Sequence, residues 1–300
     1  MSKLIVITGC TATGKTKTAV ELAKRINGEV ISADSMQIYR GMNIGTAKAT
    51  TKEMQGIRHH MLDIASPFER FTVAEYQGLV LPIIEDIQFR GRVPIICGGT
   101  GLYINSILFK MTFSDYDENI KNDVKDLVAT LSKQELWQYL NNIDPNRASE
   151  LSVNDVKRVS RAIEIALSKS QATTDETQLS RFDSQIYILN GDRAEIYDRI
   201  NKRVDIMLEQ GLLDEVKNLL SMGIPTTSQA IQAIGYKELS SYLQGETTLE
   251  EAVETIKKKS RNYAKRQLTW FRRYYPNAIY LDYNELERNL DTIEKNYYGE

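Results

Sequence analysis

One eight-residue stretch near the N-terminus constrains the fold of this chain more than any other. Residues 9–16 read GCTATGKT, which matches the pattern G-x-x-x-x-G-K-[ST] of a phosphate-binding loop. An apolar run at residues 4–7 precedes it, and apolar residues recur at helical spacing through residues 17–26. Strand, glycine-rich turn and helix are the context that such a loop requires. We therefore predict that a polyphosphate is bound by Gly9, Cys10, Thr11, Ala12, Thr13, Gly14, Lys15 and Thr16.

The residue types in this loop suit an anion for physical reasons. Glycines let the backbone curl so that several N–H groups point at one anion, and the following helix adds its positive dipole end. Lys15 adds a mobile cation, and the hydroxyl of Thr16 is placed to hold a magnesium ion. The motif leaves open which group the polyphosphate carries.

Composition places the chain among ordinary globular proteins. Its 300 residues suffice for one large domain or two modest ones, and it is 42% hydrophobic and 26% charged. No apolar run approaches a membrane span, and residues 1–3 lead straight into a strand rather than a signal peptide. The two cysteines, Cys10 and Cys97, follow apolar strands, so we expect free thiols in a reducing cytoplasm. The net charge of −2 gives no global indication of a nucleic-acid partner.

A second strand is predicted at residues 29–33, after Asn27-Gly28 ends the first helix. Two strands joined by a helix form a βαβ unit, whose default arrangement is a parallel sheet with a right-handed crossover. Ligands of such sheets gather at the carboxyl ends of the strands, where the phosphate-binding loop and Asp34 both lie. A carboxylate just past a strand end is either a functional group or a turn cap, and the local sequence slightly favours the cap.

Residues 39–63 have the character of a loop because glycines interrupt them repeatedly. The only histidines of the chain, His59 and His60, are adjacent to each other in this stretch. Neighbours in an extended chain point apart, and no cysteine or third histidine is near. A structural role is therefore expected for both rather than a zinc site.

A third strand is predicted at residues 93–97, after a helix at residues 71–89 in which Pro82 introduces a kink. Gly98-Gly99-Thr100 follows this strand at a position where an ordinary P-loop ATPase carries an aspartate. The glycines allow a ligand to approach the backbone closely. The missing aspartate argues against a standard ATPase.

The chain changes character between residues 115 and 180. This segment is charged and has helical patterns at residues 120–131, 133–140 and 153–167, and residues 171–180 (QATTDETQLS) are polar. Strand character returns at residues 185–189. The predicted fold class is therefore α/β: a P-loop NTPase-like parallel sheet core with helices on both faces and a helical insertion domain. The core is expected at residues 1–114 and 181–300, and the insertion at residues 115–180.

Two arginines, Arg199 and Arg203, lie four residues apart on a helix that we expect Asp192 to cap. They share one face of that helix. The face is either a solvated basic surface or a two-arginine clamp for phosphate, whose oxygens match guanidinium donors.

A strongly basic segment lies near the C-terminus. Between residues 257 and 273 eight residues are basic and none is acidic, and Tyr263, Trp270 and Phe271 are interleaved with them. In a mildly acidic chain this local charge suggests a docked phosphate backbone. Aromatic residues at helical spacing are more often core residues than platforms for unpaired bases, so stacking is the lesser expectation.

Together these segments make the chain resemble the bacterial tRNA dimethylallyltransferases (tRNA isopentenylpyrophosphate transferases) along nearly its whole length. The resemblance rests on GCTATGKT at 9–16, DSMQIYRGM at 34–42, IGTAK at 44–48, PIICGGTGLY at 94–103, NDVKRVSRAIE at 154–164, RINKRVDIML at 199–208 and AKRQLTWFR at 264–272. Several of these motifs are nearly diagnostic in combination, whereas the phosphate-binding loop alone is not.

The resemblance implies a transferase that moves a dimethylallyl group from dimethylallyl diphosphate to N6 of the adenosine 3′-adjacent to the anticodon in tRNA. Diphosphate would be released, with Mg²⁺ as cofactor and a tRNA anticodon stem-loop as partner. The resemblance further implies a cytoplasmic enzyme that acts as a monomer. An allylic diphosphate carries no nucleoside, which suits a phosphate loop without the ATPase aspartate. The target base would have to leave the anticodon-loop stack.

The same resemblance assigns roles to individual residues. Asp34 would be the general base toward the N6 amine, which raises it above the capping interpretation. Thr16 and Arg203 would also be catalytic, Thr16 would hold the Mg²⁺, and Arg199 and Arg203 would join loop 9–16 in binding the diphosphate. Contacts to tRNA are implied for Asp34, Ser35, Met36, Gln37, Thr100, Lys157, Arg158, Arg161, Lys265, Arg266, Gln267, Trp270 and Arg272.

The chain departs from the family pattern in places. Ala49 stands where proline is common, Ile120-Lys121 where arginine is common, and residues 171–180 replace a more glycine-containing turn. These departures concern the insertion more than the chemistry.

Two other functions remain as alternatives. One is a small-molecule P-loop kinase with Asp34 as base toward a hydroxyl, which explains the loop but not the basic segment. The other is a non-catalytic, nucleotide-gated RNA-binding protein. Binding of dimethylallyl diphosphate or of ATP separates these possibilities.

Overall fold

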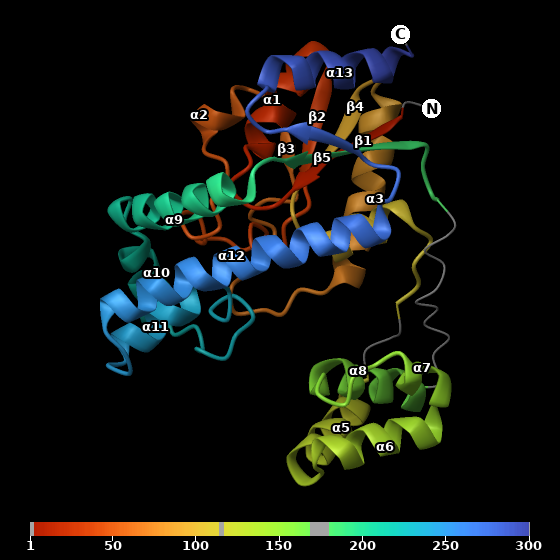
Figure 1. The fold of residues 1–300 in the computed structure, drawn as a ribbon, viewed down its shortest axis with the longest axis vertical. Coiled ribbons are helices and arrows are strands. Elements are labelled where there is room, and N and C mark those ends of the chain that lie inside the picture. The colour runs from red at the N-terminus through yellow and green to blue at the C-terminus, as the bar shows by residue number, and fades with distance from the viewer. Residues whose placement is uncertain (1–2, 114–116, 169–179, 300) are drawn as a thin grey trace. The chain divides into compact units, whose positions relative to one another are not determined.

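The computed structural model describes residues 3–113, 117–168 and 180–299 (Figure 1). The chain divides into two compact units. Unit 1 comprises Met1–Leu108 and Ser180–Glu300, and unit 2 comprises Phe109–Leu179. Each unit has its own hydrophobic core.

Unit 1 is built on a six-stranded sheet in which every pair of neighbouring strands is parallel. Its strand order is β3-β2-β4-β1-β5-β6. The strands are β1 (Leu4–Gly9), β2 (Gly28–Ser32), β3 (His59–His60), β4 (Val93–Cys97), β5 (Ser184–Asn190) and β6 (Ile279–Asp282). The predicted parallel α/β sheet is confirmed, and β1 lies inside the sheet between β4 and β5.

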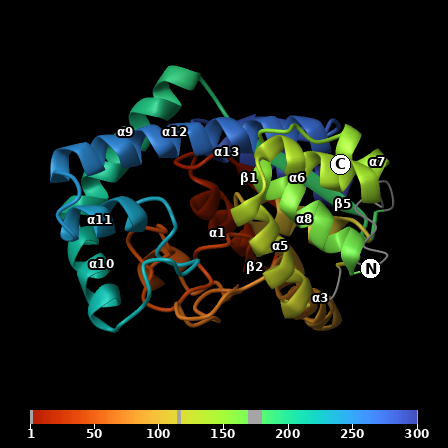
Figure 2. The ribbon, with the colours of Figure 1, turned by 90° about the horizontal axis from the view of Figure 1, so that it is seen from below.

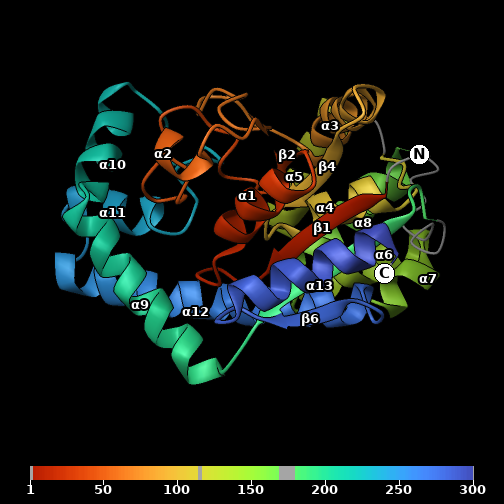
Figure 3. The same cartoon turned by 90° about the horizontal axis from the view of Figure 1, so that it is seen from above.

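One face of the sheet packs against α1 (Lys15–Arg25) and α13 (Leu286–Tyr298) (Figure 3). Ile5, Ile7 and Ile95 on this face form one buried cluster with Leu22 of α1 and Leu290 of α13. Helix α13 was not predicted from the sequence. This helix follows the edge strand β6 in the chain, and its apolar residues pack against the sheet.

The opposite face is covered as well, because Val6 and Ile96, which alternate with the residues of the first face, are fully buried. The helices near it are α3 (Val73–Phe89), α4 (Gly101–Leu108) and α12 (Leu249–Tyr274). Helix α3 begins with a capping box at Thr72 and, as the sequence predicts, contains Pro82. Helices on both faces of the sheet are therefore confirmed.

A second core of unit 1 lies among α9 (Arg193–Glu209), α10 (Leu212–Ser221), α11 (Tyr236–Leu243) and α12 (Figure 2). Tyr39 and Met42 from the segment after β2 insert into this core and are fully buried. The segment 39–63, expected to be a loop, also contains α2 (Thr51–Met54) and β3. Sequence reasoning missed α2, β3, α4, α10 and α11 as well as α13.

The two histidines of β3 have structural partners, as expected. His59 Nδ1 lies 2.9 Å from the carbonyl oxygen of Ile57, and His60 Nε2 lies 2.7 Å from Glu29 Oε2. Among the described residues, no three His, Cys, Asp or Glu side chains are grouped so that they could hold a metal ion.

Unit 2 is helical. It contains α5 (Glu118–Thr130), α6 (Lys133–Ile143), α7 (Pro145–Ser149) and α8 (Val156–Leu167), packed around a core that includes Val124, Leu136, Leu140 and Ile163. Asp144 ends α6 and caps α7, with Pro145 in its first turn. Residues 171–179 of the polar stretch 171–180 lie outside the described residues.

Within the described ranges, no helix combines the length and hydropathy that are needed to span a membrane.

Candidate active site

The phosphate-binding loop begins at the carboxyl end of β1 and leads into α1, between the ends of β4 and β5. Gly9 has φ +147°, and a Cβ at this position would lie 2.4 Å from the carbonyl oxygen of Leu189 on β5. Only glycine fits so close to a neighbouring strand. Gly14 adopts the left-handed conformation at the N-terminus of α1. The sequence pattern therefore reflects the real constraints of this turn.

Lys15 folds over the loop that it follows. Its Nζ donates a hydrogen bond to the carbonyl oxygen of Cys10 at 2.8 Å, and the hydroxyl of Thr13 donates to the same oxygen at 2.8 Å. Burial lowers the pKa of Lys15, against the opposing effects of the nearby Cys10, Cys97 and Asp34. The ammonium group is thus desolvated, and an anion in the adjoining cavity would stabilise its charged form.

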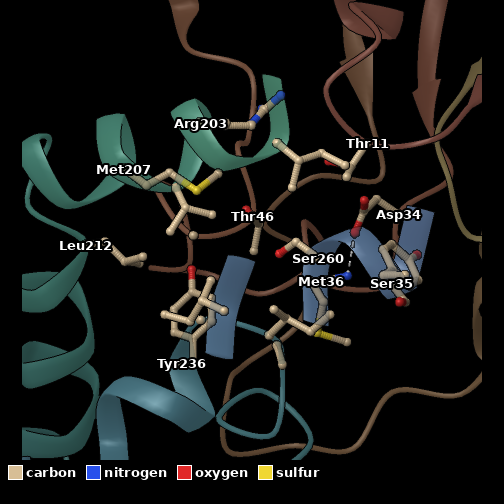
Figure 4. Close-up of a pocket in the computed structure, with 18 of the residues that line it drawn as sticks. Thr11, Asp34, Ser35, Met36, Thr46, Arg203, Met207, Leu212, Tyr236 and Ser260 are labelled. Atoms are coloured by element: carbon tan, nitrogen blue, oxygen red, sulfur yellow. Dashed lines mark hydrogen bonds between the residues drawn. The ribbon is translucent and has the colours of Figure 1, made fainter. Parts of the chain in front are cut away.

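Asp34 follows β2 and lies in the same region (Figure 4). Its Oδ1 accepts the N–H groups of Met36 at 2.8 Å and Gln37 at 3.4 Å, so Asp34 does cap a turn. Its Oδ2 has no hydrogen-bond partner among the described residues, and Asp34 lines two adjoining cavities. The two interpretations of this carboxylate are compatible because each uses a different oxygen.

The glycines after β4 allow other segments of the same chain to approach their backbone closely. A Cβ on Gly98 would lie 2.2 Å from the carbonyl oxygen of Ala33, and one on Gly99 would lie 2.1 Å from Gln267 Nε2. Both glycines also line the cavity that contains Lys15 and Thr16, so the expected close approach of a ligand stays a prediction at these two positions. They let the β4–α4 connection pack against the backbone that carries Asp34. Thr100 Oγ1 accepts the N–H of Ser35 at 3.0 Å, which ties the two segments together.

Gln267 lies inside unit 1 rather than on its surface. The side chain is 5% exposed, accepts the N–H of Thr11 at 3.1 Å and donates to the carbonyl oxygen of Gly99 at 2.8 Å. The resemblance had implied a tRNA contact for Gln267. Both ends of the amide join the phosphate-binding loop to the β4–α4 connection, and Gln267 also lines one of the cavities of the site, so its contact with tRNA stays a prediction.

The side chains of Arg199 and Arg203 make different contacts, although both residues lie on one face of α9. Arg203 lines both cavities, and its burial lowers its pKa. Arg199 donates from Nε to the carbonyl oxygen of Ala12 at 2.8 Å, and its guanidinium lies 4.7 Å from the ring centre of Tyr283. Arg199 lines neither cavity among the described residues. Of the two arginines of the predicted clamp, Arg203 therefore lies at the cavities, whereas Arg199 holds the loop backbone at Ala12.

Two cavities meet at the centre of unit 1. The first, of about 330 Å³, is lined on one side by polar residues and on the other by the apolar side chains of Met207, Leu212 and Tyr236 (Figure 4). The second is lined by the phosphate-binding loop residues Lys15 and Thr16. Five residues line both cavities: Thr11, Asp34, Thr46, Arg203 and Tyr263. These shared residues join the two cavities into one candidate site.

Sequence reasoning missed part of the lining. Tyr263 was noted only as an aromatic residue in a basic helix, yet it lies at the junction of the cavities, where burial raises its pKa to about 12. Thr46 belongs to the IGTAK motif, which could have indicated it. Nothing in the local sequence marks Tyr236, because its place depends on packing among α10, α11 and the segment after β2.

The basic residues of helix α12 fall into two groups, those paired within unit 1 and those exposed on its surface. Lys257 pairs with Asp205 at 2.9 Å, Lys259 with Glu238 at 2.7 Å, and Arg261 Nη1 donates to Asn201 Oδ1 at 2.5 Å. These three residues hold neighbouring helices and do not form the open basic face that the sequence suggests. Farther along, the exposed basic residues are Lys265, Arg266, Arg272 and Arg273. In the first half Lys258 is exposed as well, so both halves of the basic segment offer charge to a polyanion, most of it in the second half.

Trp270 packs mainly against the protein. A Cβ on Gly101 would lie 2.3 Å from the indole, and the rings of Trp270 and Tyr274 are 4.5 Å apart between centroids. Phe271 is fully buried. The expectation that these aromatics serve as core is met by Phe271 and largely by Trp270.

Three predicted tRNA contacts lie in unit 2. Lys157, Arg158 and Arg161 are exposed on α8. Arg158 pairs with Asp155 at 3.2 Å and Arg161 with Glu164 at 2.8 Å, both within one turn of helix. Such exposed pairs are weak, on the order of 0.5 kcal/mol, so a phosphate could replace them at small cost.

Comparisons with known proteins agree with one another. The model of the family described as IPP transferase matches residues 37–274. A tRNA dimethylallyltransferase from Halalkalibacterium halodurans is 47% identical over 299 residues, covering 97% of this chain and 95% of that protein. The full-length tRNA isopentenylpyrophosphate transferase from Bacillus halodurans is 45% identical, with a TM-score of 0.75 over 100% of this chain and 98% of that one. A eukaryotic dimethylallyltransferase acting on tRNA is 30% identical, with a TM-score of 0.81 over 96% of this chain and 75% of that one.

Proposed function

The chain belongs to the IPP transferase family, and from this membership we propose that it transfers a dimethylallyl group from dimethylallyl diphosphate to tRNA. The acceptor is N6 of the adenosine 3′-adjacent to the anticodon. The observation that carries the proposal is the meeting of two cavities at Thr11, Asp34, Thr46, Arg203 and Tyr263. A cationic, N–H-rich cavity suits a diphosphate, and the adjoining, partly apolar cavity suits a planar base and an allylic tail.

The diphosphate is the leaving group. As the C–O bond between the allylic carbon and the diphosphate breaks, negative charge grows on the departing oxygens. The loop N–H groups, Lys15 and Arg203 are held next to the cavity where this charge would develop. Lys15 would exchange its bond to the Cys10 carbonyl for phosphate oxygens. Fixed donors of this kind stabilise a developing anion without rearranging at the moment of reaction.

Asp34 is proposed as the general base. The N6 amine is a poor nucleophile because its lone pair is delocalised into the ring. As the C–N bond forms, one N6 proton passes to Asp34 Oδ2, the oxygen that has no other partner among the described residues. Oδ1 stays bound to the N–H groups of Met36 and Gln37, which fixes the carboxylate while Oδ2 accepts the proton. The products are N6-dimethylallyl adenosine and diphosphate.

Mg²⁺ is proposed as the cofactor, with Thr16 as its protein ligand. Magnesium commonly binds through one or two protein oxygens, substrate phosphates and waters rather than in an all-protein cage. Thr16 lines the phosphate cavity, and its hydroxyl is an oxygen ligand of the kind that such a site uses. When bound, the ion would add positive charge beside the diphosphate.

The proposed tRNA contacts fall into two groups. Ser35, Met36, Gln37 and Thr100 adjoin Asp34, where the flipped adenosine would enter. Lys265, Arg266, Arg272 and the unit 2 residues Lys157, Arg158 and Arg161 offer exposed positive charge to the anticodon stem-loop. We take a single chain as the acting unit, because every residue named here for the chemistry belongs to unit 1.

The direct test is transfer of labelled dimethylallyl diphosphate to unmodified tRNA with the full chain and Mg²⁺. Digestion of the tRNA and mass spectrometry should show one N6-dimethylallyl adenosine, located 3′ of the anticodon. Unmodified tRNA after incubation would refute the proposal. Replacing the diphosphate by ATP tests the kinase alternative, which requires nucleotide turnover without any RNA.

A further inference from the structure

A carboxylate outside the proposed chemistry holds a loop that lines both cavities. Glu215 of α10 accepts the N–H groups of Asn43 and Ile44 on Oε2, each at 2.8 Å. Its Oε1 accepts the N–H of Gly45 at 3.1 Å and the hydroxyl of Tyr236 at 2.6 Å. Four donors thus use the acceptor positions of one carboxylate. Three successive N–H groups that converge on an anion form the arrangement with which many proteins bind phosphate, and here a side chain occupies it.

The loop at residues 43–47 reaches the reaction centre directly. Gly45 and Thr46 line the partly apolar cavity, and Thr46 and Ala47 line the phosphate cavity. The carbonyl oxygens of Thr46 and Ala47 accept from Gln37 Nε2 at 3.1 and 3.4 Å. The N–H of Gln37 in turn donates to Asp34 Oδ1 at 3.4 Å. Hydrogen bonds at both ends of loop 43–47, together with its backbone and Gln37, therefore connect Glu215 to the proposed base.

The packing leaves the loop little freedom at this junction. Tyr236 is 0% exposed, and a Cβ on Gly45 would lie 2.6 Å from its ring. At the far end of the loop Lys48, 8% exposed, donates to the carbonyl oxygen of Tyr39 at 2.7 Å and to Asp63 Oδ1 at 2.6 Å. Lys48 fixes where the loop ends, whereas Glu215 fixes where it meets the cavities.

From these contacts we propose that Glu215 is a positioning residue for the transfer reaction. It holds loop 43–47 as part of the wall between the two cavities. Through Gln37, it also fixes the position of the Asp34 carboxylate relative to the bound dimethylallyl diphosphate. This inference rests on the proposed function. Glu215 itself touches neither the diphosphate-binding loop nor Asp34, so its effect should appear in turnover rather than in tRNA binding.

The test variant is Glu215→Gln in the full chain. The amide keeps the volume of the side chain but removes the charge and turns an amino group toward backbone N–H donors. We expect kcat to fall roughly 10- to 100-fold, since displacements near 1 Å have such effects. The dissociation constant for tRNA should change by less than about twofold, in line with a role remote from the exposed basic surfaces. Asp214→Asn is the matched control, because Asp214 is the exposed neighbour on α10 and pairs with the exposed Lys217.

Two further measurements separate positioning from general stability. Hydrogen exchange at the amides of Asn43, Ile44 and Gly45 should speed up in Glu215→Gln and not in Asp214→Asn. In a double-mutant cycle with Gln37→Ala, the loss of kcat should be clearly smaller than the product of the two single losses, because both changes break one chain of contacts. If Glu215→Gln does not fold, Tyr236→Phe removes one hydrogen bond and should lower kcat roughly three- to tenfold.

The outcomes are distinct for the two proposals. A wild-type chain that makes no modified adenosine refutes the proposed function. A wild-type chain that makes it, with Glu215→Gln retaining full kcat, refutes the positioning role alone. If the double variant loses kcat by the product of the two single fold-losses, Glu215 acts independently of Gln37. That result would also overturn the inference.

Discussion

The Nε of Arg199 donates to the carbonyl oxygen of Ala12 at 2.8 Å, so the phosphate-binding loop is held from its outer side by a residue of α9. Ala12 has φ +67°, an unfavourable conformation for a residue with a side chain. The ring of Tyr283 stacks on the guanidinium of Arg199, and its hydroxyl donates to Glu195 Oε2 at 2.8 Å. One turn away on the same helix, Arg203 faces the cavities. The two arginines therefore have different tasks.

Substituting each arginine by alanine should separate these tasks. Arg203→Ala removes a cation next to the developing charge, and we expect kcat/KM for dimethylallyl diphosphate to fall about 100- to 1000-fold. Arg199→Ala removes one support of the phosphate-binding loop and should lower kcat/KM about tenfold. This is the effect of losing one hydrogen bond from a charged donor. Steady-state kinetics with varied diphosphate measure both. Arg193→Ala on the exposed face of α9 serves as control, and equal losses in the two variants would contradict the division.

Asp34→Asn should separate capping from catalysis. The asparagine oxygen can still accept the N–H groups of Met36 and Gln37, so the local fold should persist. The second carboxylate oxygen is lost as a base, and kcat should fall roughly 100- to 10,000-fold while tRNA binding stays within about twofold. Single-turnover transfer and filter binding provide the two readouts. Asp192→Asn, which caps α9 with the same geometry, should leave turnover unchanged. A nearly normal rate for Asp34→Asn would exclude the base role.

The sequence predicts the sheet core of unit 1 well because its determinants are local. An apolar run followed by GCTATGKT specifies β1, the loop and the start of α1, and the predicted bounds of β4 are those of the structure. The helices of unit 2 follow in the same way from capping residues and periodicity. Asp34 and Thr100 could be placed near the loop because parallel strands bring their carboxyl ends to one edge.

The parts that could not be predicted depend on contacts between distant segments. Gln267 meets Thr11 across 256 residues, and Glu215 meets Asn43 across 172. No periodicity or motif encodes these pairs, because each depends on how whole helices pack. The same reason explains the error over the basic helix, where Lys257 and Arg261 look free in the sequence but contact α9.

The second half of the basic segment should contribute to tRNA binding through charge alone. Lys265→Ala and Arg272→Ala should each weaken tRNA binding severalfold at moderate salt. Each should also reduce the slope of log K against log salt by about 0.7 to 0.9, the effect of losing one phosphate contact. Binding isotherms at several salt concentrations measure this slope. Lys217→Ala, an exposed lysine on α10, is the control, and unchanged slopes for Lys265 and Arg272 would remove them from the interface.

Glu29 is a buried carboxylate on β2, away from the cavities, and only 1% exposed. Arg90 Nη2 donates to its Oε2 at 2.9 Å, His60 Nε2 lies 2.7 Å from the same oxygen, and Arg92 Nη1 lies 3.3 Å from Oε1. The hydrogen bond from Arg90 is the main cause that lowers the pKa of Glu29 to about 2, against the effect of burial. The cluster joins β2, β3 and the end of α3.

This lowered pKa predicts how stability depends on pH. The usual pKa of a glutamate is 4.5, so the ionised Glu29 stabilises the folded state fully above that pH and loses its effect as the pH falls toward 2. Glu29→Gln removes the buried partner of Arg90, which keeps only its exposed pair with Asp86, and should lower the free energy of unfolding by roughly 3 kcal/mol at pH 7. Urea unfolding at pH 7, 5, 4 and 3 should show this difference shrinking below about pH 4.5. Glu85→Gln on the exposed face of α3 should show no such trend, and a difference that stays constant down to pH 3 would contradict the ion-pair explanation.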